Sequence, residues 1–164
     1  MEIYRGRRLW VEKRTIRLPM GTEREKIIIH PGHAVAILPI EGDRVKLLRQ
    51  YRYAVDQYIM EAPAGTMEPG EDPADCARRE LIEETGFAAV KIVERGFIWT
   101  TPGFTDEKIF LFEGRGLSPS TEFGKDEDEI IEVVDVPLKD LDTMIRDGSI
   151  CDAKTIALIH RCFR

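Results

Sequence analysis

The chain has 164 residues, a length that suits one domain with a small additional segment. Its 30 acidic residues exceed its 24 lysines and arginines, and the net charge of -6 disfavours a nucleic-acid-binding protein. Hydrophobic residues make up 43% of the chain, enough for a core, and no apolar run approaches the about 20 residues of a membrane-spanning helix. The three cysteines lack CxxC spacing, so no disulfide framework is expected, and a cytoplasmic location is predicted.

The first 30 residues form a predicted β subdomain, followed by a main domain over residues 31–164. Residues 15–18 alternate polar and apolar side chains, and Pro19 to Gly21 supplies a turn. About 30 residues cannot bury their own apolar surface, so this segment is predicted to pack on the main domain or on a second copy. Its basic residues indicate either a solvated strand face or a rim that faces phosphate: Arg5, Arg7, Arg8, Lys13, Arg14 and Arg17.

In the main domain, apolar runs between turn signals predict strands that are interspersed with three helices. The predicted strands cover residues 27–29, 35–38, 45–48, 58–60, 90–93, 97–99, 109–112 and 130–136. Helices are predicted over residues 73–85, after Pro137 as far as Gly148, and from near Asp152. This pattern indicates an α+β domain.

The helix over residues 73–85 has well-defined ends. Asp72 is a good N-cap and Pro73 suits the first helical position. Gly86 suits the left-handed residue that follows the last turn.

Three carboxylates form one stripe on this helix. At about 100° per residue, Glu80 and Glu84 lie about 40° apart, and Glu83 lies about 60° to the other side of Glu80. Like charges at this spacing destabilise a helix, so a cation is expected nearby; Arg78 and Arg79 are candidates, although Arg79 points about 100° away from Glu80. Such a stripe is either a solvated acidic face or a set of hard oxygen ligands for Mg²⁺ or Mn²⁺.

The residues around this helix resemble the Nudix box. Gly65 is followed after five residues by Glu71, and after seven more by Arg79-Glu80-Leu81-Ile82-Glu83-Glu84-Thr85-Gly86-Phe87, which together match the motif at nine specified positions. The preceding loop is not a phosphate-binding P-loop, because no Gly-Lys-Ser/Thr follows. The resemblance implies the Nudix fold, a mixed β-sheet sandwiched between helices. It also implies hydrolysis of a nucleoside diphosphate linked to another group.

The resemblance further implies two or three bound Mg²⁺ ions, with Mn²⁺ as a substitute. Such ions neutralise the oxygens of a diphosphate and help to deprotonate water. Glu71 and Glu83 would either bind an ion or hold Arg79, whereas Glu83 and Glu84 are also expected to be catalytic. The expected metal ligands are the backbone carbonyl of Ala64 and the side chains of Glu71, Glu80, Glu83 and Glu84.

Two further segments resemble the ADP-ribose pyrophosphatase branch of this family. Pro102 lies 16 residues beyond Gly86, at the branch's marker position, and residues 49–52 resemble its segment before the box. The resemblance implies that Arg52 binds the pyrophosphate, for which a guanidinium is well suited. The alternatives are a plain Pro-Gly turn and an exposed strand arginine. The expected substrate-binding residues are Arg52, Glu61, Pro102 and Glu107, with the two glutamates reaching ribose hydroxyls.

A second acidic cluster spans residues 126–129. The branch places its general base in a loop at this position, and Glu127 and Glu129 are both candidates. A solvated acidic loop is the alternative interpretation.

The branch also forms homodimers in which the N-terminal strands are exchanged. A partner aromatic, Tyr4 or Trp10, would then stack on adenine, although Trp10 is better interpreted as core. The predicted function is Mg²⁺-dependent hydrolysis of ADP-ribose to AMP and ribose 5-phosphate. A pyrophosphatase for another nucleotide sugar or a broad range of substrates is the main alternative. A non-catalytic nucleotide sensor is a minor one, because the box carboxylates are all present.

Overall fold

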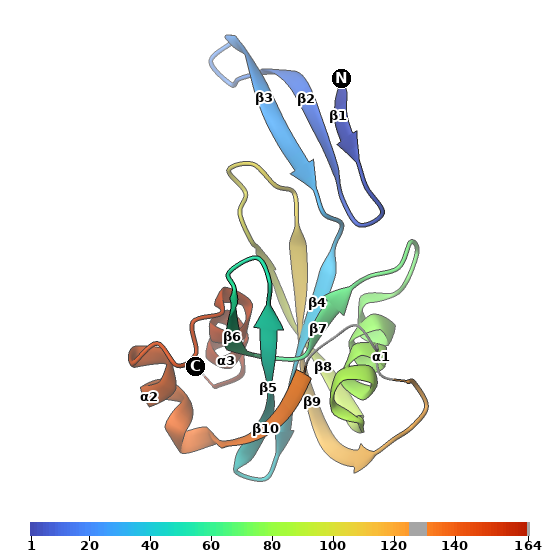
Figure 1. The fold of residues 1–164 in the computed structure, drawn as a ribbon, viewed down its shortest axis with the longest axis vertical. Helices are drawn as coiled ribbons and strands as arrows, with labels where there is room; N and C mark the ends of the chain where they lie inside the picture. The colour runs from blue at the N-terminus through green and yellow to red at the C-terminus, as the bar shows by residue number, and fades with distance from the viewer. Residues whose placement is uncertain (125–130, 164) are drawn as a thin grey trace.

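The small N-terminal sheet projects from one end of the molecule (Figure 1). The structure is a computed structural model that describes residues 1–124 and 131–163. The sheet contains three antiparallel strands, β1 (Glu2–Arg5), β2 (Trp10–Arg17) and β3 (Glu23–His30). The predicted β structure of the first 30 residues is therefore confirmed.

The large sheet contains seven strands in the order β10-β5-β4-β9-β8, with β6 paired to β5 and β7 paired to β4. Strands β4 and β9 run parallel, and the other pairs are antiparallel, so the sheet is mixed as predicted. Its strands are β4 (Ala34–Glu41), β5 (Arg44–Arg52), β6 (Gln57–Glu61), β7 (Ala64–Thr66), β8 (Phe87–Trp99), β9 (Lys108–Pro119) and β10 (Ile131–Pro137).

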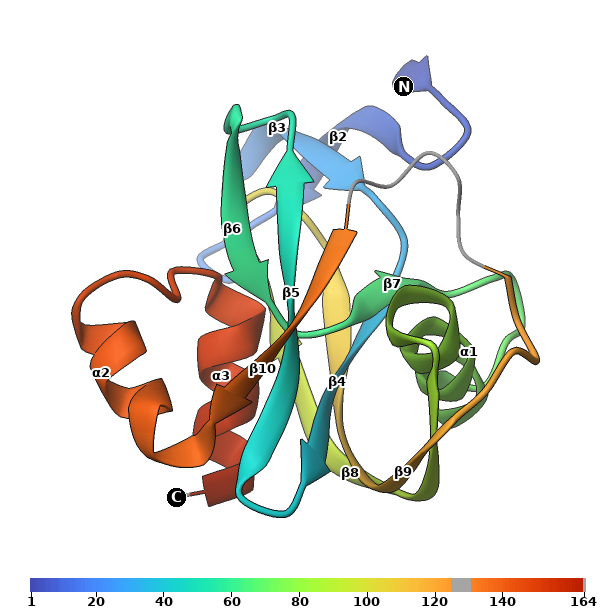
Figure 2. The same ribbon diagram turned by 60° about the horizontal axis from the view of Figure 1, so that its bottom comes forward.

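Helices lie on both faces of the large sheet (Figure 2). One face carries α1 (Pro73–Thr85), and the other carries α2 (Leu141–Arg146) and α3 (Ala153–Phe163). The 3₁₀ turn η1 (Leu138–Asp140) leads into α2. The mixed sheet sandwiched between helices is therefore confirmed. None of the described helices is long and apolar enough to span a membrane.

Strand β4 explains why the sheet needs helices on both sides. Its residues from 35 to 40 are all buried, and successive side chains point to opposite faces. Leu38 and Ile40 belong to the core that contains residues of α2 and α3, whereas Val35 and Ile37 belong to the core beneath α1. Because both faces of this strand are buried, its sequence is a continuous apolar run and does not alternate with polar residues.

Two elements differ from the prediction. Residues predicted as two strands form the single strand β8, whose register shifts between Glu94 and Phe97. A bulge adds unpaired residues without ending the ladder, so the break in the apolar pattern did not separate two strands. The helix predicted after Pro137 begins as a 3₁₀ turn, which is a frequent start for a helix.

Polar and aromatic contacts join the small sheet to the loop between β8 and β9. His30 Nδ1 lies 2.5 Å from Asp106 Oδ2, and His30 Nε2 lies 3.1 Å from Glu12 Oε1. The Trp10 ring stacks on His30, with 3.8 Å between ring centroids. Trp10 is therefore half-buried at this junction and does not enter the main core.

The end of α1 provides a stability prediction. Gly86 follows the helix with φ 74° and ψ 18°, a conformation that is costly for a residue with a Cβ. No atom lies within 4 Å of a Cβ added there, so the cost comes from the backbone alone. We expect Gly86→Ala to lower the free energy of unfolding by about 1 kcal/mol in urea titrations. Gly103→Ala is the control, because Gly103 has equal space and no positive φ. Equal losses in both variants would contradict this explanation.

Candidate active site

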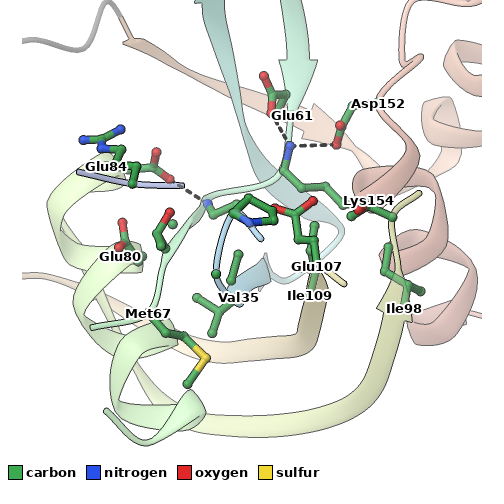
Figure 3. A pocket seen from close by; sticks show the side chains of 18 of the residues that line it. Val35, Glu61, Met67, Glu80, Glu84, Ile98, Glu107, Ile109, Asp152 and Lys154 are labelled. Carbon is green, nitrogen blue, oxygen red and sulfur yellow. Dashed lines mark hydrogen bonds and ion pairs between the residues drawn. The ribbon is translucent and has the colours of Figure 1, made fainter. Parts of the chain in front are cut away.

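A cavity of about 1260 Å³ opens where strands of the large sheet, helix α1 and the first turn of α3 meet. Figure 3 shows Glu80 and Glu84 on one side of this cavity and Asp152 and Lys154 on the other. Val35 and Ile109 contribute apolar side chains between the two walls. The cavity therefore has two charged walls, which come from helices on opposite faces of the sheet.

Helix α1 forms the acidic wall. Glu80 and Glu84 are only 9% and 7% exposed, although both are carboxylates. Glu84 Oε2 accepts a hydrogen bond from the backbone N–H of Ala64 at 2.8 Å. Glu80 lies directly against Gly65, where an added Cβ would come within 1.9 Å of the Glu80 carboxyl carbon. The glycine that opens the Nudix box is therefore required for this close approach of strand β7 to the helix.

Arg79 compensates the negative charge of this wall. Its Nε lies 3.0 Å from Glu71, and its Nη1 lies 2.6 Å from Glu80 and 2.8 Å from Glu83. The helical angle of Arg79 did not predict these contacts, because a long side chain can bend back across the helix surface. The hydrogen bonds from Arg79 hold the pKa of Glu71 below its ordinary value, and the same contacts raise the pKa of Arg79.

The acidic wall has the donor chemistry that a hard divalent cation requires. Carboxylate oxygens of Glu80 and Glu84 lie beside the backbone at Ala64 and Gly65, and oxygen ligands suit Mg²⁺ and Mn²⁺. Among residues 1–124 and 131–163, no three acidic, histidine or cysteine side chains already surround a common metal position. Arg79 instead bridges three of the carboxylates.

The opposite wall contains a chain of alternating charges. Arg52 donates two hydrogen bonds to Glu61, at 2.6 and 2.9 Å. Lys154 also pairs with Glu61, and its Nζ lies 3.1 Å from Asp152. Burial of Glu61, which is 1% exposed, would raise its pKa, but the contacts with Arg52 and Lys154 outweigh burial and lower it. Glu61 is thus a buried carboxylate that two cations keep ionised.

This wall adds to the sequence-based expectation in two ways. Glu61 was expected to reach ribose hydroxyls, and it lines the cavity, but its carboxylate also binds Arg52 and Lys154. Lys154 and Asp152 were not singled out, because Lys154 follows Glu61 by 93 residues. A lysine and an aspartate at the start of an amphipathic helix resemble ordinary surface charges, and no local signal marks them.

The remaining predicted residues have different positions. Glu107 lines the cavity and is half-buried. Pro102 is exposed in a turn, and the two residues before it, Thr100 and Thr101, line the cavity. The candidate bases Glu127 and Glu129 lie outside the described residues. Two basic residues of the N-terminal segment also line the cavity, consistent with the rim interpretation: Arg7 and Arg8.

Comparison with known proteins identifies the family. A family model described as the NUDIX domain matches residues 30–159, which is most of the chain. The chain belongs to the Nudix family. This match and the hydrolases to which the chain is similar together show that it is a Nudix hydrolase. Nudix hydrolases generally use divalent metal ions, in agreement with the donor chemistry of the acidic wall.

Several relatives of this Nudix chain have names that state an activity. It is 36% identical to the ADP-ribose pyrophosphatase of Bacillus subtilis (strain 168) and to the methanol dehydrogenase activator of Bacillus methanolicus. Each match spans 162 residues and covers 97% of this chain and 87% of the relative. The GDP-mannose pyrophosphatase of Cronobacter sakazakii (strain ATCC BAA-894) is 40% identical over 140 residues, covering 79% of this chain and 71% of the relative.

The fold is shared with a solved structure. The crystal structure of an ADP compounds hydrolase has a TM-score of 0.88 and 26% sequence identity, and the match covers 99% of this chain and 88% of that chain. The similarity therefore includes the small N-terminal sheet as well as the main domain.

Gly65 provides a test of the acidic wall. We expect Gly65→Ala to displace the Glu80 carboxylate and to weaken Mn²⁺ binding roughly tenfold or more in calorimetric titrations, because the new methyl group takes the space of the Glu80 carboxylate. Gly103→Ala is the control, since its Cβ meets no atom within 4 Å and its φ is not positive. Unchanged Mn²⁺ affinity in Gly65→Ala would show that Glu80 does not bind the ion.

Proposed function

We propose that this Nudix hydrolase is an ADP-ribose pyrophosphatase. ADP-ribose and one water would give AMP and ribose 5-phosphate. The observation that carries this proposal is the 36% identity to an ADP-ribose pyrophosphatase over nearly the whole chain. The similarity to an ADP compounds hydrolase supports the same class of substrate. The cavity supplies the chemistry, since it combines a metal-binding type of acidic wall with a guanidinium suited to a diphosphate.

In this proposal, Glu80 and Glu84 are the principal ligands of two or three Mg²⁺ ions, and the carbonyl of Ala64 completes the set. Glu71 and Glu83 hold Arg79, which keeps the acidic wall charged and in place. When bound, the ions would neutralise diphosphate oxygens and help to deprotonate the attacking water. Mn²⁺ has similar ligand preferences and would substitute for Mg²⁺.

The opposite wall would bind and orient the substrate. Arg52 is 38% exposed at the cavity and would bind the diphosphate, while Glu61 fixes its position. Glu107 would accept a hydrogen bond from a ribose hydroxyl. Pro102 would shape the loop that follows β8. Glu127 or Glu129 would accept the proton of the attacking water.

The small N-terminal sheet supports the proposal of a homodimer with exchanged N-terminal strands. Several of its apolar side chains are exposed, although three strands cannot bury a core of their own: Ile3 at 51%, Tyr4 at 57% and Ile27 at 56%. Tyr4 is the better candidate for stacking on adenine, because His30 covers one face of Trp10. We propose a cytoplasmic location on the cysteine usage alone.

A second candidate function is hydrolysis of another nucleotide sugar. The 40% identity to a GDP-mannose pyrophosphatase favours it, and the acidic wall would perform the same chemistry. The nucleotide-sensor alternative has less support, because Glu71, Glu80, Glu83 and Glu84 are all present and connected through Arg79 or Ala64.

A substrate panel tests the proposal. With Mg²⁺, we expect ADP-ribose to be converted to AMP and ribose 5-phosphate faster than ADP-glucose, GDP-mannose, NADH, diadenosine polyphosphate or a nucleoside triphosphate. Ion-exchange chromatography of the products measures this, and EDTA should abolish turnover. Preference for GDP-mannose would support the second candidate function. Absence of any cleavage with Mg²⁺ or Mn²⁺ would support the sensor.

Glu84 provides a test of the metal-ligand assignment. We expect Glu84→Gln to lower kcat by about two orders of magnitude, because a neutral amide is a poor ligand for a hard cation. The fold should persist, since an amide oxygen can still accept the hydrogen bond from Ala64. Asp75→Asn is the control, because Asp75 is an exposed acid in the first turn of the same helix. Turnover near that of the wild type in Glu84→Gln would refute the assignment.

A further inference from the structure

Lys154 stands where helix α3 meets the wall of the cavity that carries Arg52. Its side chain is 12% exposed and pairs with the buried carboxylate of Glu61, as Figure 3 shows. Arg52 binds the same carboxylate with two hydrogen bonds. One carboxylate therefore serves two cations, of which Arg52 is the more exposed, at 38%.

The register of β5 and β6 shows that Arg52 depends on this arrangement. Arg52 pairs with Gln57 across the ladder, whereas Glu61 pairs with Leu48. The backbones of Arg52 and Glu61 are thus offset by four residues, or roughly 13 Å along the strands. Both side chains must extend along the sheet to meet. The sheet alone does not hold the Arg52 guanidinium in place, and the position of the Glu61 carboxylate decides where it lies.

Helix α3 fixes the position of Lys154 through a hydrogen bond between Thr155 and the backbone of Ala62. Thr155 is fully buried, and its Oγ1 accepts a hydrogen bond from the backbone N–H of Ala62 at 2.7 Å. The same hydroxyl donates to Asp152 Oδ2 at 2.6 Å, and that oxygen also accepts from the backbone N–H of Thr155. The first turn of α3 is therefore attached to the residue that follows Glu61. This attachment places the Lys154 ammonium beside Glu61.

The charges explain what Lys154 adds. A carboxylate that binds one guanidinium bidentately cancels most of its positive field. A second cation on the same carboxylate, which Glu61 shares with Asp152, draws negative charge away from Arg52. It also satisfies lone pairs that would otherwise be buried without a partner.

We infer that Lys154 is a positioning residue: it holds the Glu61 carboxylate so that the Arg52 guanidinium is presented to the substrate diphosphate. The inference rests on the proposed function, in which Arg52 binds that diphosphate. Lys154 lines the same cavity, and in this inference its effect on the substrate passes through Glu61.

The test compares Lys154→Met with Lys154→Arg. We expect Lys154→Met to raise the KM for ADP-ribose roughly tenfold, the loss typical of one charge-assisted hydrogen bond, with kcat changed less than about twofold. Lys154→Arg keeps the charge and should restore most of the affinity. Lys139→Met is the control, because Lys139 is exposed in η1 and does not line the cavity. An unchanged KM in Lys154→Met would overturn the inference.

A double-mutant cycle asks whether Lys154 acts through Arg52. In an Arg52→Met background, we expect Lys154→Met to cause no further loss of affinity, since the guanidinium that it positions is absent. The same fold-loss in both backgrounds would mean that Lys154 acts independently, and the inference would be wrong.

Two measurements keep this result separate from folding and from the choice of substrate. If Lys154→Met does not fold, Glu61→Gln combined with Lys154→Met removes the buried charge together with its partner. This double variant should still bind weakly, and wild-type affinity in it would refute the inference. The affinities of the same variants for ADP and GDP, measured in EDTA, rank the variants without any turnover. If the wild type fails to hydrolyse ADP-ribose, the proposed function fails, while the ranking with ADP and GDP still tests the role of Lys154.

Discussion

The repulsion between carboxylates on one turn of α1 is the constraint on which this site depends. Four acidic side chains converge near the start of β7, and a folded chain tolerates them only with a compensating cation. Arg79 supplies that cation by bridging Glu71, Glu80 and Glu83. The loop before the helix brings Glu71 within reach, and Gly65 lets the backbone approach Glu80. In this motif the positive charge of Arg79 therefore offsets the negative charge of the glutamates, and each specified residue restricts what its neighbours in the motif can be.

The two walls of the cavity pair their buried charges in different ways. On α1, one guanidinium serves several carboxylates, and oxygen atoms remain in excess. On the wall formed by β5, β6 and α3, Glu61 serves both Arg52 and Lys154, Asp152 also pairs with Lys154, and Arg52 stays at the cavity. A substrate with a diphosphate, bound together with divalent cations, has charge to match both walls. The mixed sheet keeps the walls apart, because its two faces carry the two sets of helices.

Local patterns in the sequence predicted most of the fold and one wall of the site. The limits of α1 follow from Asp72, Pro73 and Gly86, whose cap geometry needs only neighbouring residues. The acidic stripe follows from helical spacing. The contacts of Arg79 with Glu71 and Glu83 were one of two alternatives that the family resemblance offered. Its contact with Glu80 was not expected, because a helical angle locates only the Cβ atom. The pairing of Lys154 with Glu61 was missed because it joins residues 93 positions apart, and such a contact depends on the topology of the whole sheet.

The long separation between Glu61 and Lys154 has a consequence for the newly made protein. A ribosome adds residues at roughly 5–20 per second, so Lys154 is made about 5–20 s after Glu61. By the end of that interval the Nudix box and strands β5 and β6 have been synthesised, but the α3 part of the facing wall has not. The growing polypeptide therefore contains all the carboxylates of the acidic wall before Lys154 has been added. Because α3 is the last element of the chain, the cavity gains its second wall in full only at the end of synthesis.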